Sequence, residues 1–161
     1  MNPKIFRPTL LLVLACFAAL AVPAPAREKF SPDDLEIVEQ RWPEAKQTYT
    51  GLRYIIQEPG DAKGPSPAPG MKVSVVYKGM LLNGKVFDQN TAANPLKIRL
   101  DRGDLIDGWE QALQKMHKGE KWLLIVPPEL AYGARGRPPE IKRYTTLVFE
   151  MELLDFGPDL K

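Results

Sequence analysis

The stretch DLIDGWEQALQKMHKG, residues 104–119, predicts an amphipathic helix around which the rest of the chain is organised. Asp104 or Asp107 can cap its start, and Gly119 is expected to end it. The apolar side chains recur at helical spacing: Leu105, Ile106, Trp109, Ala112, Leu113 and Met116. Trp109 then either packs in the core or forms the floor of a pocket, and this choice decides the function.

Downstream of residue 50, the remaining sequence predicts strands and turns. Strands are expected over residues 52–57, 72–82, 85–87, 96–100, 120–126 and 145–154. Asn83-Gly84 is a two-residue hairpin signal between the second and third of these segments. A lone helix among strands predicts a curved sheet that closes over that helix.

The N-terminus carries the pattern of a signal peptide. Lys4 and Arg7 accompany an apolar run over residues 9–22, and Ala24-Pro25-Ala26 offers small residues for cleavage. We therefore expect residues 1–26 to be removed and the protein to be periplasmic or secreted. Two alternatives stay open: an uncleaved N-terminus that anchors the chain in a membrane, and lipid attachment at Cys16.

A short helical arm is expected over residues 27–50, ahead of a main domain over residues 51–157 and a tail over residues 158–161. Ser31 stands at a helix N-cap position, and Pro32 follows at the first helical position. The arm is too short to fold alone, so it is expected to lie on the main domain rather than to act as a dimerisation module. A monomer is therefore expected.

The charge balance and the cysteine count exclude several function classes. The full chain carries 22 Lys and Arg against 20 Asp and Glu. Cleavage after Ala26 removes two cations and no acids, which leaves 22 − 2 = 20 cations against 20 acids. No nucleic-acid partner is expected from such a neutral chain. Cleavage also removes Cys16, the only cysteine, so neither a disulfide nor thiol chemistry is expected.

Residues suited to acid–base or metal chemistry are scarce. His117 is the only histidine, and its place at the predicted helix end favours a solvated side chain. The sequence offers no Cys–His cluster for zinc, no Ser–His pair and no glycine-rich phosphate loop. Four acids could in principle do acid–base work, although a helix start explains the last three better: Asp88, Asp101, Asp104 and Asp107. No metal, no cofactor and no proton transfer are therefore expected.

Five motifs, in this order, resemble the FKBP family of macrolide-binding prolyl isomerases over about residues 51–157. They are VYKGML (76–81), NGKVFD (83–88), LIDGW (105–109), IVPPELAYG (125–133) and TLVFEMELL (146–154). The resemblance implies an α+β fold, in which a curved antiparallel β-sheet of about five strands wraps around one short α-helix. This agrees with the pattern of strands and helix described above.

The resemblance also implies an apolar cleft with Trp109 as its floor. The residues expected to act in catalysis are Tyr77, Asp88 and Tyr132, and those expected to bind substrate are Phe87, Leu96, Leu105, Ile106, Trp109, Ile141 and Phe149. In the family, the equivalents of Asp88 and Tyr132 offer polar side-chain contacts. The resemblance also implies that the backbone N–H of Ile106 and the loop around Ile141 meet substrate carbonyls. Leu96 stands where an aromatic residue is usual, so one wall of the cleft is expected to be smaller.

The implied function is peptidyl-prolyl cis-trans isomerisation, which would assist the folding of exported proteins. An apolar cleft can do this without a base, because it favours the twisted X–Pro bond by excluding water. The implied partners are proline-containing polypeptides, unfolded exported proteins and macrolide inhibitors. The main alternative is a periplasmic holdase chaperone with little turnover. A carboxylate-based hydrolase is far less favoured, since it needs two acids that face one pocket.

The sequence departs from the family pattern at two further places. No arginine follows Asp88 where some members place its ion-pair partner. Ile141 is followed by Lys142-Arg143 in place of the usual Pro-Pro, and Pro138-Pro139 precede it. The loop over the cleft therefore carries positive charge. We expect a tilt toward substrates with acidic flanks, and macrolide affinity becomes doubtful.

Overall fold

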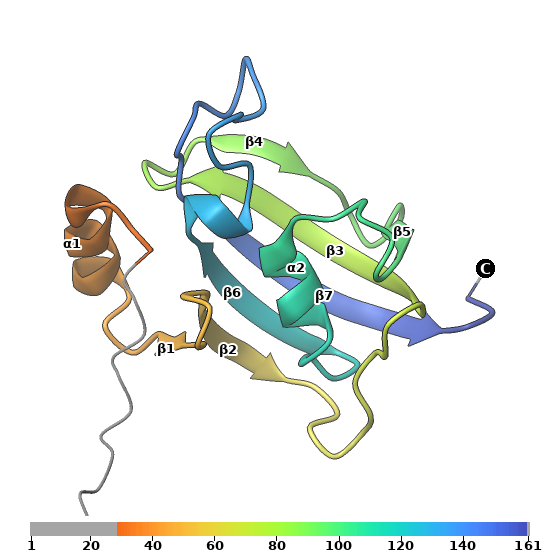
Figure 1. Cartoon of the computed structure of the whole chain (residues 1–161). Coiled ribbons are helices and arrows are strands. Elements are labelled where there is room, and N and C mark those ends of the chain that lie inside the picture. Colours follow the sequence, from red (N-terminus) through yellow and green to blue (C-terminus); the bar gives the residue numbers. More distant parts are fainter. Residues whose placement is uncertain (1–28, 161) are drawn as a thin grey trace, which may run out of the picture.

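The computed structural model describes residues 29–160, so the signal peptide expected over residues 1–26 lies outside the described part (Figure 1). One antiparallel sheet runs in the order β1-β2-β6-β7-β3-β4, and β5 also pairs with β3. The strands are β1 (Lys46–Gln47), β2 (Arg53–Pro59), β3 (Lys72–Leu81), β4 (Val86–Gln89), β5 (Leu96–Arg99), β6 (Glu120–Val126) and β7 (Leu147–Gly157). The helices are α1 (Pro32–Arg41), α2 (Asp107–Leu113) and the 3-10 turn η1 (Pro128–Leu130).

This architecture confirms the predicted α+β fold, with α2 lying across one face of the sheet (Figure 1). The sheet has seven strands rather than about five. Part of the difference is β1, a two-residue strand that pairs with β2 and that the sequence pattern does not signal. The rest lies at the opposite edge, where β4 and β5 are two short strands that both pair with β3.

Alternation along β6 builds a core on each face of the sheet, because successive strand side chains point to opposite faces. Trp122 and Leu124 join the core around α2, whereas Leu123 and Ile125 join a second cluster around Val38 of α1. The inner core holds the buried apolar face of α2, with Trp109, Ala112 and Leu113 at 5% exposure or less, and Met116 from the turn that follows the helix. The two helices therefore cover opposite faces of one sheet.

Helix α2 is shorter than the predicted helix over residues 104–119. Ile106 occupies the N-cap position and makes no side-chain capping hydrogen bond, so the expectation that Asp104 or Asp107 caps the helix is wrong. The carboxylate of Glu110 instead accepts the backbone N–H of Asp101 at 3.0 Å, which ties the preceding loop to the helix. Residues 114–119 form turns rather than continuing the helix.

The arm packs on the main domain at both of its ends. Ser31 caps α1 by accepting the backbone N–H of Asp34 at 3.2 Å, as its sequence position predicts. The Asp34 carboxylate accepts the hydroxyl of Thr146 at 2.6 Å, and Arg41 donates to the backbone carbonyl of Leu82. Helix α1 is therefore tied to the start of β7 and to the β3–β4 hairpin. No helix within residues 29–160 is long and apolar enough to cross a membrane.

Strand β3 changes its pairing partner from β5 to β4 along its length, in the region where α2 begins. Strand β5 pairs with β3 up to Val75, and β4 takes over from Lys78. Between them, the side chain of Asn90 accepts the backbone N–H of Tyr77 at 2.8 Å and donates to the carbonyl of Val75 at 3.0 Å. The side-chain amide thus takes the place of a neighbouring strand. The backbone N–H of Tyr77 and the carbonyl of Val75 therefore stay hydrogen-bonded between the end of β5 and the start of β4.

Candidate functional site

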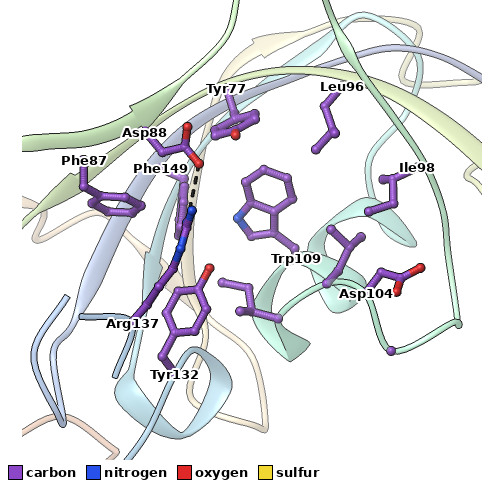
Figure 2. Close-up of a pocket in the computed structure, with 13 residues that line it drawn as sticks. Tyr77, Phe87, Asp88, Leu96, Ile98, Asp104, Trp109, Tyr132, Arg137 and Phe149 are labelled. Carbon is purple, nitrogen blue, oxygen red and sulfur yellow. Dashed lines mark ion pairs between the residues drawn. The ribbon is translucent and has the colours of Figure 1, made fainter. Parts of the chain in front are cut away.

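A cavity of about 310 Å³ opens at the N-terminal end of α2 (Figure 2). Its volume is at the lower end of the range for small-molecule and peptide side-chain sites. The lining residues come from β3, β4, β5, α2, β7 and the loops beside them: Tyr77, Phe87, Asp88, Leu96, Ile98, Gly103, Asp104, Leu105, Ile106, Trp109, Tyr132, Arg137 and Phe149. Every predicted site residue except Ile141 is in this set.

Four aromatic rings form the apolar end of the cavity. Trp109 meets Tyr77 edge-on at a centroid distance of 4.8 Å and Phe149 edge-on at 5.2 Å. Phe149 in turn meets Phe87 edge-on at 5.8 Å. These T-shaped pairs match the quadrupole preference of aromatic rings, so the indole is held in one orientation at the centre of the cavity (Figure 2).

Gly79 on β3 makes this ring arrangement possible. A Cβ at Gly79 would lie 2.7 Å from Cζ of Phe87 and 2.9 Å from Cε1 of Phe149. Both distances are too short for carbon atoms, so any larger residue would displace one of the two rings. The glycine of the VYKGML motif therefore leaves the space that the rings of Phe87 and Phe149 occupy.

The indole N–H of Trp109 has no hydrogen-bond partner within residues 29–160, although the side chain is only 5% exposed. The backbone N–H of Ile106 is also without a partner in this part of the chain. Both groups belong to residues that line the cavity. The indole nitrogen is buried beneath the ring surface, so the N–H of Ile106 is the donor to which a bound molecule can present a carbonyl.

A polar group of side chains closes the opposite wall. Arg137 lies 3.5 Å from the carboxylate of Asp88, and Figure 2 shows this ion pair beside the hydroxyl group of Tyr132. Hydrogen bonding to the Tyr132 side chain and electrostatic attraction to it raise the pKa of Arg137. Burial, followed by hydrogen bonding to Asp88, raises the pKa of Tyr77 to about 12. The Tyr77 phenol thus remains protonated at neutral pH.

Arg137 is the main site residue that sequence reasoning missed. The bend after Asp88, where some family members place its ion-pair partner, is filled by residues 91–94 and holds no arginine. The structure supplies the guanidinium from the β6–β7 loop (residues 127–146), 49 positions further along the chain (137 − 88 = 49). Ile98 and Gly103 were also missed, and Asp104, which was assigned to helix capping, lines the cavity.

Ile141 is the one predicted site residue that the structure places elsewhere. Its side chain is 1% exposed and belongs to the core around α2. Its backbone exchanges two hydrogen bonds with Arg137, at 2.8 and 3.0 Å. Ile141 thus braces the loop segment that carries Arg137, while its own side chain stays outside the cavity lining.

The site holds no arrangement suited to metal chemistry within residues 29–160, where no group of three His, Cys, Asp or Glu side chains converges. His117 lies in the turns after the C-terminal end of α2, with Nδ1 3.3 Å from Oε1 of Glu120. The ionisable residues at the cavity are the two tyrosines, Asp88, Asp104 and Arg137. The cavity thus sets an apolar wall beside polar side chains and the N–H of Ile106.

Comparisons with known proteins agree with this geometry. A family model described as FKBP-type peptidyl-prolyl cis-trans isomerase matches residues 64–154. The chain is 46% identical over 114 residues to the FKBP-type peptidyl-prolyl cis-trans isomerase FkpA of Escherichia coli K12, covering 70% of this chain and 40% of that protein. It is 39% identical over 116 residues to a probable FKBP-type peptidyl-prolyl cis-trans isomerase of Haemophilus influenzae, covering 71% of this chain and 46% of that protein. The chain thus spans less than half the length of these curated relatives.

Solved structures show the same fold. The crystal structure of FkpA from Escherichia coli superposes with a TM-score of 0.69 at 39% identity, over 80% of this chain and 60% of that one. A peptidyl-prolyl cis-trans isomerase from Pseudomonas syringae pv. tomato gives a TM-score of 0.65 at 37% identity, over 79% of this chain and 97% of that one.

Proposed function

The chain belongs to the family of FKBP-type peptidyl-prolyl cis-trans isomerases, and on that premise we propose that it catalyses rotation about X–Pro bonds in polypeptides. The observation that carries this proposal is the open cavity of about 310 Å³ with an oriented indole at its centre and aromatic rings on its walls. A prolyl ring is an apolar group of the size that such a cavity accepts.

The mechanism we propose needs no proton transfer. Resonance keeps the X–Pro bond planar and sets a barrier of about 18–20 kcal/mol. At the twisted transition state this resonance is lost, and with it part of the carbonyl dipole that water solvates. A dry cavity therefore favours the twisted form relative to the planar one. If the cavity stabilises the twisted form by about 5 kcal/mol more than the planar form, the rotation is accelerated by nearly four orders of magnitude.

Each group at the site has a role in this scheme. Trp109, Phe87 and Tyr77 hold the prolyl ring, since their rings define the apolar end of the cavity. The backbone N–H of Ile106 is open to a substrate carbonyl and would fix the flanking peptide while the bond turns. Asp88 acts with Arg137 by holding the β6–β7 loop against β4, so its contribution is one of position.

The test is an isomerisation assay on the purified protein with a short proline-containing peptide, run beside a refolding assay on a proline-free client. We expect a rate of cis-trans exchange well above the spontaneous rate. A protein that prevents aggregation of the proline-free client but leaves the exchange rate at its spontaneous value would be a holdase, and the isomerase proposal would fail. Chelators should leave the rate unchanged, because the scheme uses no metal or cofactor.

We further propose that the protein works on unfolded exported polypeptides, as a monomer outside the cytoplasm. The support is the sequence pattern over residues 1–26, with cleavage after Ala26. Mass spectrometry of the protein recovered from fractionated cells tests this, and the expected mature chain begins at Arg27. An intact N-terminus, or a lipid on Cys16, would place the protein at a membrane instead. Sedimentation of the same sample tests the monomer.

A further inference from the structure

Two cations on the outer face of the sheet, Lys121 and Lys78, are paired with acids. Lys121 lies 2.8 Å from Glu58 and 3.8 Å from Glu152. Lys78 lies 3.9 Å from Glu150. Pairs of this kind leave little net field for a passing ligand, because each charge is balanced by its neighbour.

The β6–β7 loop differs, since most of its cations have no acidic partner. Arg135, Lys142 and Arg143 are exposed, and no carboxylate within residues 29–160 lies at ion-pair distance from them. Arg137 is paired with Asp88, and Glu129 and Glu140 are the only acids of the loop. Of these four cations only Arg137 lines the cavity, and the other three lie within two residues of the bridge that Arg137 forms with Ile141. We call these four residues the basic rim.

The loop between β5 and α2 gives the cavity an acidic rim. Asp101, Asp104 and Asp107 are exposed and make no ion pair within the described residues, and Arg102 is the only cation among residues 100–107. Asp104 lines the cavity directly. Figure 2 shows Asp104 and Arg137 on opposite sides of Trp109, so the two rims face each other across the indole.

We infer that these two rims orient the bound peptide, so that a proline flanked by one acidic and one basic residue is isomerised faster in one order of charges than in the reverse order. This inference rests on the proposed isomerase function and names the substrate class of the same site. Opposite charges attract, so the acidic side chain of the peptide lies toward the basic rim and its basic side chain toward the acidic rim. Reversing the order places like charges together at both ends.

The expected size of the effect follows from the exposure of these charges. Exposed ion pairs are individually weak, so the two orders should differ in kcat/KM by roughly three- to tenfold at low ionic strength. Salt should remove the difference, because the screening length falls from about 10 Å at 0.1 M to about 3 Å at 1 M. A ratio near one in 1 M salt is therefore expected, while the neutral peptide is still turned over.

The experiment compares three peptides of equal length that share the same residue before proline. One carries Glu on the N-terminal side and Lys on the C-terminal side, one has the reverse order, and one is neutral. Exchange NMR reports the isomerisation rate without a coupling protease, whose own charge preference would confound the ratio. Turnover of the neutral peptide tests the proposed function alone. Turnover of the neutral peptide with equal kcat/KM for the two charged orders overturns the orientation inference and leaves the isomerase proposal standing.

Two matched variants then locate the effect. A triple variant of the basic rim, with Arg135→Gln, Lys142→Gln and Arg143→Gln, should lower the ratio between the two orders by at least half. A distant triple variant, with Lys46→Gln, Lys63→Gln and Lys115→Gln, changes the net charge equally at exposed positions. This second variant should keep the ratio. An equal loss in both variants would assign the preference to net charge and overturn the inference.

Discussion

Trp109 and Trp122 belong to one hydrophobic core and are almost equally buried, at 5% and 3% exposure. Each also packs on a tyrosine. Trp122 stacks on Tyr54 at 4.4 Å with an interplanar angle of 12°, whereas Trp109 meets Tyr77 edge-on at 4.8 Å. Their surroundings differ in one respect that matters: the indole N–H of Trp122 donates to Glu120 at 2.8 Å, and that of Trp109 has no partner within residues 29–160.

This difference separates a tryptophan whose polar atom is satisfied within the fold from one that lines the cavity with its polar atom left unpaired. Glu120 is itself 2% exposed, and its carboxylate also accepts the backbone N–H of His117, so the indole N–H and this carboxylate are both hydrogen-bonded within the protein. An unpaired buried donor such as the Trp109 N–H costs about 1–3 kcal/mol. Burial alone therefore does not distinguish the two indoles, whereas hydrogen bonding does.

The largest expected effect is on stability, in Trp122→Ala. Truncation of a buried tryptophan costs about 3–5 kcal/mol, and here it also removes the indole donor from the buried carboxylate of Glu120. Urea denaturation should show this loss of unfolding free energy, while the folded fraction keeps most of its kcat/KM. A variant that stays as stable as the parent would contradict the assignment of Trp122 to the fold.

The next effect is on catalysis, in Trp109→Ala. Loss of the apolar surface that the indole offers to a prolyl ring should cost about 1.5–3 kcal/mol, which is roughly a ten- to 150-fold fall in kcat/KM. Trp109→Phe is the matched control, because it keeps a ring for the edge-on contacts with Tyr77 and Phe149. Isomerase kinetics on both variants should rank them Ala below Phe below parent. Equal activity in all three would remove the indole from the mechanism.

A smaller effect is expected at the polar wall, in Asp88→Ala. Because the carboxylate holds Arg137 rather than moving protons, its loss should cost about 1 kcal/mol, or roughly fivefold in kcat/KM. Arg137→Gln should cost a similar amount, and the double variant should lose less than the sum, since both changes break one interaction. Near-total loss of activity in Asp88→Ala alone would contradict a mechanism without proton transfer.

The smallest effect is on the pH dependence of stability, through Tyr77. Its pKa is raised to about 12 from an ordinary value of 10.0, first by burial and then by Asp88. The unfolded chain therefore loses the phenol proton first, so the stabilising contribution is complete below about pH 10 and is lost as the pH rises toward about 12. Tyrosine ring NMR during an alkaline titration checks this, with Asp88→Asn expected to lower the pKa. A pKa of Tyr77 near 10 in the parent protein would refute the contact with Asp88.

The sequence predicted those parts of the molecule whose signals are local. Strand β6 has the predicted bounds, Glu120–Val126, because an apolar run of strand length ends at two prolines. The hairpin signalled by Asn83-Gly84 also forms, but its loop is longer than the predicted two residues. The N–H of Gly84 donates to the carbonyl of Leu81 at 2.9 Å, so Leu82 and Asn83 are the central turn residues and Gly84 follows them with a φ of 85°. Most of the cavity lining could be named in advance, because the motifs that carry it are short and keep their order along the chain.

The remaining features depend on contacts between distant segments. The Asp88–Arg137 pair joins β4 to the β6–β7 loop, and no spacing rule links two such positions. Ile141 is apolar in a loop, and that pattern alone does not tell whether its side chain lines the cavity or enters the core. The length of α2 was overestimated because Met116 continues the apolar spacing past Leu113 while the backbone has already left the helix.

Both edges of the sheet end in very short strands: β1 has two residues, and β4 and β5 have four each. A long exposed edge offers a row of free N–H and C=O groups on which another extended chain can pair. A protein that handles unfolded polypeptides meets such chains at high local concentration. Under the proposed function, β4 and β5 offer such chains only short segments to pair with, and β1 covers two residues of β2, which leaves the free edge of β2 at residues 55–59.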